Sequence, residues 1–417
     1  MGTAETLRVV ETVWRIESAR LIAGLARLTR DLSQAEELAQ EALEAALRQW
    51  PDDGVPRNPG AWLMAAGKRR AVDGFRRSSM IERKHRELAD ELEPVDLSAA
   101  TIEERIDDDI GDELLALIFT ACHPVLGTEA RVALTLKLVA GLSTAEIASA
   151  FLISETTVAQ RIVRAKKALA NADVGYEVPR GAERDARLSS VLEVIYLIFS
   201  EGYSPAAEDA WTRPALCEEA MRLGRILGGL ALADAEVHGL IALMELQASR
   251  LPTRTGPDGA PVLLLDQDRS RWDRTLIQHG LKALAVADRL GPPGPYALQA
   301  AIAAFHARAL TPDATDWAGI AARYDDLYRV LPSPVVDLNR AVAKAMAFGP
   351  EVGMALVDGI IAEGSLGDYH LLFSVRGEFL TRLGRNSEAR AALLKAAALA
   401  RSDRERKLME ERAATLG

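Results

Sequence analysis

Residues 142–169, LSTAEIASAFLISETTVAQRIVRAKKAL, have the pattern of two helices joined by a short turn. Ser143 and Glu146 have the spacing of a capping box, which predicts that a helix starts there. Ser154 is placed to cap a second helix that runs to Leu169. Apolar residues of this second helix recur at helical spacing, so they predict one buried stripe. They are Val158, Ile162, Ala165 and Leu169.

The face opposite this stripe carries polar and cationic side chains. A helix with such a face has the width and the donors to enter the major groove of DNA, where arginine reads guanine and glutamine reads adenine. The pattern also fits a solvated face whose cations favour the C-terminal end of the helix. The outward side chains are Thr156, Gln160, Arg164 and Lys167, with Arg161 on the flank.

The composition predicts an all-α protein of several domains. Its 417 residues exceed one ordinary core, and no segment shows clear strand alternation. Cys122 and Cys217 lie far apart without a CxxC partner, which argues against a disulfide framework or a structural zinc site. We find neither a signal-peptide pattern nor an apolar run of membrane-spanning length. We therefore expect a cytoplasmic protein that makes no membrane contact.

Charge is distributed unevenly, which matters more for a polyanionic partner than the net charge of −10. Two basic islands flank an acidic run over residues 87–111, which is typical of a solvated linker. The sequence thus predicts a first module over 1–86 and a second over 112–173. The first island comprises Lys68, Arg69, Arg70, Arg76, Arg77, Arg83, Lys84 and Arg86. The second comprises Arg161, Arg164, Lys166 and Lys167.

The first module begins with an amphipathic helix, AEELAQEALEAALRQW, over residues 35–50. One row of this helix is apolar and predicts burial, and the opposite row is acidic and would repel DNA. The acidic row could bind a basic protein surface or could simply be solvated. The apolar row is Ala39, Leu43, Ala46 and Trp50, and the acidic row is Glu37, Glu41, Glu44 and Arg48.

A helix break is predicted over Pro51–Pro59, followed by RNPGAWLMAAGKRRAVDGFRR at residues 57–77. Here Trp62 stands near the cations of residues 68–77. An aromatic residue beside cations suits unstacked bases and phosphates, although Trp62 could equally belong to the core.

The chain from residue 182 to 417 predicts a third, helical region. It starts with an apolar helix over 188–199 and is interrupted over 252–268. From about residue 296, helix pairs begin at a spacing close to that of tetratricopeptide repeats, which predicts an α-solenoid; an unrelated alanine-rich bundle is the alternative. We expect Gly384 to end one helix and Asn386 or Ser387 to cap the next. The pairs are 296–309 with 317–330, 334–348 with 351–363, and 369–383 with 387–400.

In this order, the motifs resemble the extracytoplasmic-function sigma factors of bacterial RNA polymerase over about residues 7–172. AEELAQEAL resembles the helix that docks on the clamp helices of the polymerase β′ subunit. NPGAWL with KRRAVDGFRR resembles the segment that reads and melts the promoter −10 element, and residues 142–169 resemble the −35 helix-turn-helix. The resemblance implies core RNA polymerase, including its β flap, and promoter DNA as partners.

The resemblance also implies residue roles. Core binding is assigned to Glu37, Gln40, Glu41, Glu44 and Arg48. Recognition of the −10 element is assigned to Arg57, Asn58, Trp62, Lys68, Arg69, Arg70, Arg76 and Arg77, with residues 57–60 holding a flipped base. Recognition of the −35 element is assigned to Ser154, Thr156, Thr157, Gln160, Arg161, Arg164 and Lys167.

Two positions depart from the family pattern. Lys68 and Arg69 stand where the family often has Arg-Asn, so base preferences cannot be carried over. Leu152 stands where the helix-turn-helix often has glycine, and it would be strained if that position needs a positive φ.

The third region resembles the branch of these sigma factors that carries a tetratricopeptide-like extension. The resemblance rests on LLLDQDRSRWDRTLI at 263–277 and GPYALQAAIAAFHARA at 294–309. We expect the extension to tune the exposure of the two DNA modules through contacts within the chain. Its concave surface could alternatively hold a partner peptide or a small ligand.

A sigma factor is not an enzyme, so we expect no catalytic residue, no cofactor and no metal. For the cluster of Asp266, Asp268 and Asp273 with Arg269, Arg271 and Arg274, mutual ion pairing is a simpler explanation than a metal site. Cys122 and His123 are adjacent and point about 100° apart on a helix, which disfavours a shared site. Isolated histidines are expected to be packing or surface residues; they are His238, His279, His306 and His370.

Two other classes of protein compete with this interpretation. One is a helix-turn-helix regulator with a repeat-based sensor domain that binds an operator as a dimer. The other is a tetratricopeptide scaffold that binds peptides without DNA. Both leave the acidic helix and the basic island of the first module unexplained.

Overall fold

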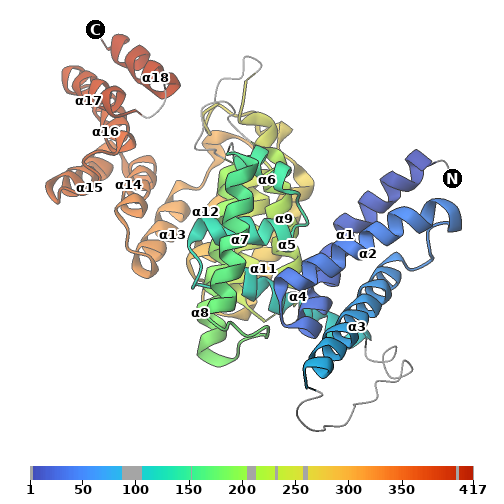
Figure 1. Ribbon diagram of the computed structural model, residues 1–417. Coiled ribbons are helices and arrows are strands. Elements are labelled where there is room, and N and C mark those ends of the chain that lie inside the picture. The colour runs from blue at the N-terminus through green and yellow to red at the C-terminus, as the bar shows by residue number, and fades with distance from the viewer. Residues whose placement is uncertain are drawn as a thin grey trace. The chain divides into compact units, whose positions relative to one another are not determined.

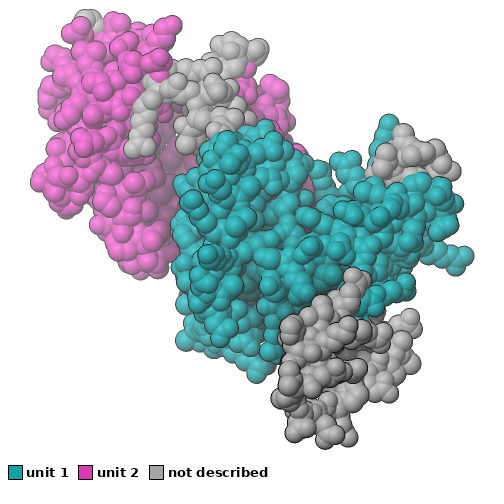
Figure 2. Space-filling view, viewed as in Figure 1, with its two compact units in different colours: residues 1–201 teal, residues 202–417 magenta. Residues whose placement is uncertain are grey.

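The computed structural model describes residues 3–86, 106–151, 153–203, 213–230, 233–256, 262–400 and 403–416, and these residues form an all-α fold (Figure 1). The chain divides into two compact units, residues 1–201 and 202–417, which Figure 2 colours separately. No helix among the described residues is both long and apolar enough to cross a membrane.

The first unit contains two small helical modules and one further helix. α1, α2 and α3 form the first module, α4 to α7 form the second, and α8 follows. Their bounds are α1 Thr3–Thr29, α2 Leu32–Asp53, α3 Pro59–Arg86, α4 Ile106–Ala121, α5 Thr128–Leu138, α6 Thr144–Phe151, α7 Glu155–Asn171 and α8 Gly181–Tyr203.

Small side chains hold the first module together. Ala35, Ala39 and Ala42 of α2 have no exposed surface, and their size allows α2 to pack closely against α1 and α3. The predicted apolar row of α2 is buried except for Leu43, which is half-buried. Trp50 closes the row at 2% exposure.

The break after α2 is shorter than predicted. The helix continues through Pro51 to Asp53, and Gly54 ends it with φ 83° while its N–H donates to the Trp50 carbonyl at 3.0 Å. Pro51 lacks an N–H to donate to the carbonyl four residues before it, and the helix ends two residues after it. The residues between the helices are therefore 54–58 rather than 51–59.

The second module buries the predicted stripe of α7. Val158, Ile162, Ala165 and Leu169 are all buried, and α7 packs on α5 and α6. α4 begins at Ile106, so part of the predicted linker over 87–111 is helical. Residues 87–105 lie outside the described residues.

Most of α8 falls in the first compact unit, which ends at residue 201, whereas the predicted start of the extension at residue 182 stays a prediction. Arg131 of α5 donates to Glu193 of α8 at 2.9 Å and also to Ser190. Arg187 of α8 donates to the Phe119 carbonyl at 3.3 Å. The apolar helix predicted over 188–199 lies within α8 and is joined to the second module by these contacts, and the second unit begins at residue 202.

The second unit is built from consecutive helices around α10. Between Val237 and Leu246 almost every residue of α10 is buried, and the helix contacts α9, α11 and α12. Gly239 permits the contact with α12, because a Cβ there would lie 2.6 Å from the Ala297 nitrogen. The elements are α9 Pro214–Leu230, α10 Ala235–Ala248, η2 Leu251–Thr253, η3 Arg269–Arg271, α11 Arg274–Leu290, α12 Pro295–Arg308, η4 Pro312–Ala314, α13 Trp317–Val330, α14 Pro334–Phe348, α15 Pro350–Ala362, α16 His370–Arg382, α17 Asn386–Leu399 and α18 Asp403–Ala414.

From α13 to α18 each helix packs mainly on its neighbours in sequence, as Figure 1 shows in orange and red. The helices coincide closely with the predicted pairs, and their tetratricopeptide character remains a prediction. Gly384 ends α16 with φ 72°, as predicted. The predicted cap is wrong: Arg385 precedes α17 without a side-chain cap, and its guanidinium instead pairs with Glu388 at 2.6 Å.

Candidate nucleic-acid and polymerase interface

α7 presents the predicted DNA-reading face to solvent. Ser154 caps the helix, accepting the Thr157 N–H at 3.1 Å, so it serves the fold of the helix. Thr156, Gln160, Arg164 and Lys167 are exposed, whereas Thr157 is half-buried. Arg161 is also half-buried and pairs with Glu129 at 2.7 Å. The groups free to reach base edges are therefore the four exposed side chains.

The helix before it, α6, starts with the predicted capping box. The Ser143 N–H donates to Glu146 Oε2 at 2.7 Å, and the Glu146 N–H donates to Ser143 Oγ at 3.1 Å. Glu146 also pairs with Arg15 of α1 at 3.4 Å. Leu152, in the turn to α7, lies outside the described residues.

Glu146 predicts a small pH dependence of stability. The Ser143 N–H holds the pKa of Glu146 below its ordinary 4.5, with smaller contributions from Arg15 and Lys137. Because the folded pKa lies below the unfolded one, this stabilisation is complete above about pH 4.5 and is lost as the pH falls. Thermal melting from pH 7 to pH 3 should show a smaller acid loss for Glu146→Gln than for wild type. Glu155→Gln, a change of an exposed carboxylate, is the control; an equal effect of both variants would contradict the assignment.

The −10 segment places its residues around the start of α3. Asn58 Oδ1 accepts the Ala61 N–H at 3.1 Å, so Asn58 caps α3 while Arg57 beside it stays exposed. Trp62 is half-buried and meets Trp50 edge to face, with ring centroids 5.4 Å apart. Trp62 thus packs on the core through Trp50 and stays partly exposed, and its contact with DNA remains a prediction.

The basic residues of α3 differ in their availability. Arg69 is exposed and Lys68 is half-buried. Arg70 pairs with Glu41 of α2 at 3.4 Å, so it links the predicted core-binding and −10 faces instead of standing free for DNA. Arg76 and Arg77 lie on α3, but their side chains are outside the described part of the structure.

The acidic row of α2 lies open to a partner. Glu37, Gln40 and Glu44 are exposed, and Arg48 pairs with Glu44 at 3.5 Å. A shallow groove of about 480 Å³ runs along this face, where four carboxylates outnumber two guanidinium groups. The groove is lined by Gln34, Glu37, Leu38, Glu41, Glu44, Arg48, Arg70 and Asp73. Its excess negative charge suits a basic protein surface.

Sequence reasoning missed the contact between the two modules. Glu36 of α2 is 9% exposed, and its carboxylate is shared by Lys137 of α5, at 3.5 Å, and Lys166 of α7. The sequence indicated that Glu36 is buried, because it lies three residues before Ala39 and therefore continues the apolar row of α2. A carboxylate in such a row needs a buried cation, and Lys166 supplies one from the recognition helix.

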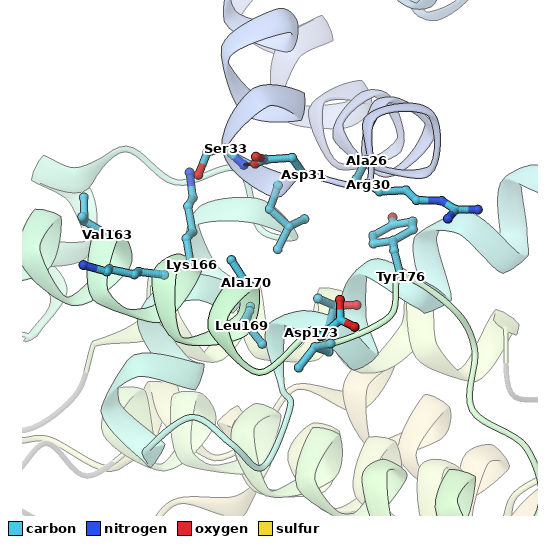
Figure 3. A pocket seen from close by; sticks show the side chains of 14 residues that line it. Ala26, Arg30, Asp31, Ser33, Val163, Lys166, Leu169, Ala170, Asp173 and Tyr176 are labelled. Atoms are coloured by element: carbon cyan, nitrogen blue, oxygen red, sulfur yellow. Dashed lines mark hydrogen bonds between the residues drawn. The ribbon is translucent and has the colours of Figure 1, made fainter. Parts of the chain in front are cut away.

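Further contacts join the modules around a pocket of about 450 Å³. Arg27 of α1 pairs with Glu113 of α4 at 3.1 Å, and the Tyr176 hydroxyl donates to the Glu113 carbonyl at 2.9 Å. In Figure 3, Lys166 points from α7 toward Ser33 at the start of α2. The modules are thus docked in one compact unit, which corrects the view that the linker simply holds them apart.

The clusters considered for metal or nucleophilic chemistry have structural roles. Asp268 caps η3, accepting the Ser270 N–H at 3.0 Å, and Asp273 caps α11, accepting the Thr275 N–H at 2.8 Å. The expected mutual ion pairing is therefore replaced by helix capping. Cys122 is buried and its Sγ lies 3.2 Å from Thr135 Oγ1, and burial raises the pKa of its thiol to about 12.

Comparisons with known families agree with the two modules. Residues 16–80 match the family "Sigma-70 region 2", and residues 116–169 match "Sigma-70, region 4". Residues 187–288 match a family of unknown function, DUF6596.

The chain is also similar to an uncharacterized protein of Rhizobium meliloti (strain 1021). The two are 43% identical over 384 residues, which span 91% of this chain and 89% of the relative. No solved structure matches the chain.

A sigma factor acts in transcription through two modules, region 2 and region 4. Here region 2 has an acidic helix and a basic helix, and region 4 has an exposed recognition helix. The chain is therefore an extracytoplasmic-function sigma factor of the sigma-70 family with a C-terminal extension, a protein that binds core RNA polymerase and promoter DNA to initiate transcription.

Proposed function

We propose that α7 enters the major groove of the −35 element while the start of α3 reads and melts the −10 element. The observation that carries this proposal is the geometry of α7, whose apolar stripe is buried and whose Thr156, Gln160 and Arg164 are exposed. The acidic row of α2 receives the basic clamp helices of the β′ subunit, and the second module also contacts the β flap. Promoter recognition and polymerase binding then take place in the cytoplasm, where RNA polymerase and DNA are located.

The footprint of the polymerase holoenzyme on DNA tests this assignment. A sigma factor with these roles should give protection that includes both the −35 and the −10 elements, and only in the presence of core polymerase. An operator-binding regulator would instead protect one symmetric site without polymerase. The matched region 2 favours the first outcome, and a single core-independent patch would refute the proposed roles.

Charge removal on α2 should weaken polymerase binding. Glu37→Ala with Glu44→Ala removes two exposed carboxylates whose only described ion pair is the exposed contact to Arg48. We expect core affinity to fall roughly tenfold, about 1.4 kcal/mol, and more steeply at low salt. Binding of labelled protein to core polymerase measures this, and Glu11→Ala on the exposed side of α1 is the control. Weaker DNA contact with unchanged core affinity would reverse the role assignments.

We further propose that the docked first unit is a resting form that must open. A compact unit of 201 residues has a diameter of about 40 Å, whereas promoter elements about 25 base pairs apart are separated by about 85 Å. One closed unit cannot reach both.

The extension is proposed to regulate this opening. The test is deletion of residues 202–417, because a cut after residue 173 would also remove α8 and strip Arg131 of Glu193. We expect the truncated chain to differ from the full chain in core binding and in promoter-directed transcription. Equal behaviour in vitro and in cells would remove the regulatory role.

A further inference from the structure

Arg269 begins η3 in the segment 263–277, whose sequence is not explained by promoter recognition. It is the most buried arginine that the structure describes, at 3% exposure. Of the five buried Asp, Glu, Lys or Arg side chains in the described residues, it alone has no ion-pair partner of opposite charge. The other four buried charges are paired: Glu36 with Lys137 and Lys166, Arg131 with Glu193, Arg187 with Glu183, and Glu245 with Arg225.

Only one nitrogen of the Arg269 guanidinium is used. Nη1 donates to the carbonyls of His306 and Ala309, both at 3.1 Å, and thereby caps the end of α12. Nε and Nη2 are buried and have no hydrogen-bond partner among the described residues. These two nitrogens form one edge of the guanidinium, and their parallel N–H groups match the paired oxygens of a carboxylate or phosphate.

The surroundings of this edge are cationic. The Asp273 N–H donates to the Ser249 carbonyl at 2.9 Å, which holds the η3 segment against the end of α10, where Arg250 follows. Arg250 Nη2 donates a hydrogen bond to the Tyr203 hydroxyl at 2.7 Å, and the buried Nε of Arg250 has no hydrogen-bond partner in the described structure. Burial, Arg250 and Arg269 together lower the pKa of His306 to about 4.

Two other donor-bearing side chains complete the cluster. The guanidinium of Arg269 lies 5.2 Å from the ring centre of Trp272, which is 2% exposed. Trp272 Nε1 and His306 Nδ1 are buried without a partner among the described residues. The buried Arg269 charge, beside the half-buried Arg250, therefore leaves two guanidinium N–H groups of Arg269 without an acceptor among the described residues, which is costly unless an anion completes the site.

We propose that Arg250, Arg269, Trp272 and His306 form a binding site in the second unit for a small oxyanion, a phosphate or carboxylate group. The Nε–Nη2 edge of Arg269 provides the bidentate contact, and Arg250 adds the second charge. The enclosed position selects a small terminal group, since a bulky ligand would not reach these nitrogens. Such a site would make the extension responsive to an anionic metabolite, and it does not depend on how the chain reads DNA.

Titration of the full chain with inorganic phosphate and, separately, with acetate tests the site. Chloride at equal ionic strength is the reference. We expect a saturable rise in melting temperature with at least one of the two anions, and the more effective one identifies the chemical group. An equal response to chloride would overturn the proposal.

Two further measurements separate binding from general stabilisation. Arg269→Lys keeps the positive charge but removes the paired N–H groups of the guanidinium, so it should abolish the saturable response. Arg271→Lys, at an exposed neighbouring position, should retain the response. If Arg269→Lys fails to fold, NMR of wild-type histidines, assigned with His306→Gln, decides instead. A bound anion should raise the pKa of His306 from about 4 toward its ordinary value. An unchanged His306 pKa, or a full response in Arg269→Lys, would overturn the site.

Discussion

Arg164→Ala is expected to reduce transcription from the promoter that this sigma factor recognises by roughly 10- to 100-fold, because one bidentate base contact is worth about 1–3 kcal/mol. Arg164 is exposed near the middle of α7, opposite the buried stripe, so its loss should leave the fold intact. The measurement is in vitro transcription with holoenzyme at a concentration that does not saturate the promoter, together with thermal melting of the variant.

Two companion variants show whether Arg164 reads a base. Arg164→Lys keeps the positive charge and would preserve a phosphate contact, but it loses the planar fork. If Arg164 reads guanine, the lysine variant should resemble the alanine variant. Arg390→Ala, at an exposed position of α17, is the control for loss of a surface arginine. Wild-type activity of Arg164→Ala would show that α7 does not read the promoter.

Glu36→Gln is expected to open the first unit. The change leaves Lys137 and Lys166 facing each other without their shared carboxylate. Breaking a buried ion pair costs on the order of 3 kcal/mol, but here the modules can separate and return both cations to water. The cost therefore appears as a shift of roughly 100-fold toward the open form, limited by the free energy of docking.

Three observables follow from this shift. Solution scattering should show a larger radius of gyration, core polymerase should bind more tightly, and DNA that carries both promoter elements should gain affinity over DNA with the −35 element alone. Glu11→Gln on the exposed side of α1 is the control, because it makes the same change in the first module at a residue outside the assigned core-binding and DNA-binding faces. If both variants behave alike, or if Glu36→Gln only lowers the melting temperature, the carboxylate is a packing feature and not a latch.

The recognition helix could be predicted from the sequence because several local signals agree. The capping box at Ser143, the cap at Ser154 and the apolar stripe of α7 all specify the same two helices. Helix lengths in the second unit followed from the same kind of periodicity. These features depend on neighbours within about two turns, which a single sequence displays.

The remaining features depend on distant partners. Glu36 was visible as a carboxylate in an apolar row, but the sequence could not identify Lys166, which lies 130 residues away, as its partner. The position of α8 in the first unit depends on contacts between Arg131 and residues far along the chain. Arg269 could be read as one member of an Asp-Arg cluster until the structure showed that Asp268 and Asp273 cap helices.

Transcription of genomic DNA fragments by purified core polymerase shows whether the chain directs promoter-specific initiation. Addition of the full chain should produce transcripts that start at discrete sites, and core polymerase alone should not produce them. Failure of the chain to bind core polymerase at low salt, or transcripts that are the same with and without it, would contradict its function as a sigma factor.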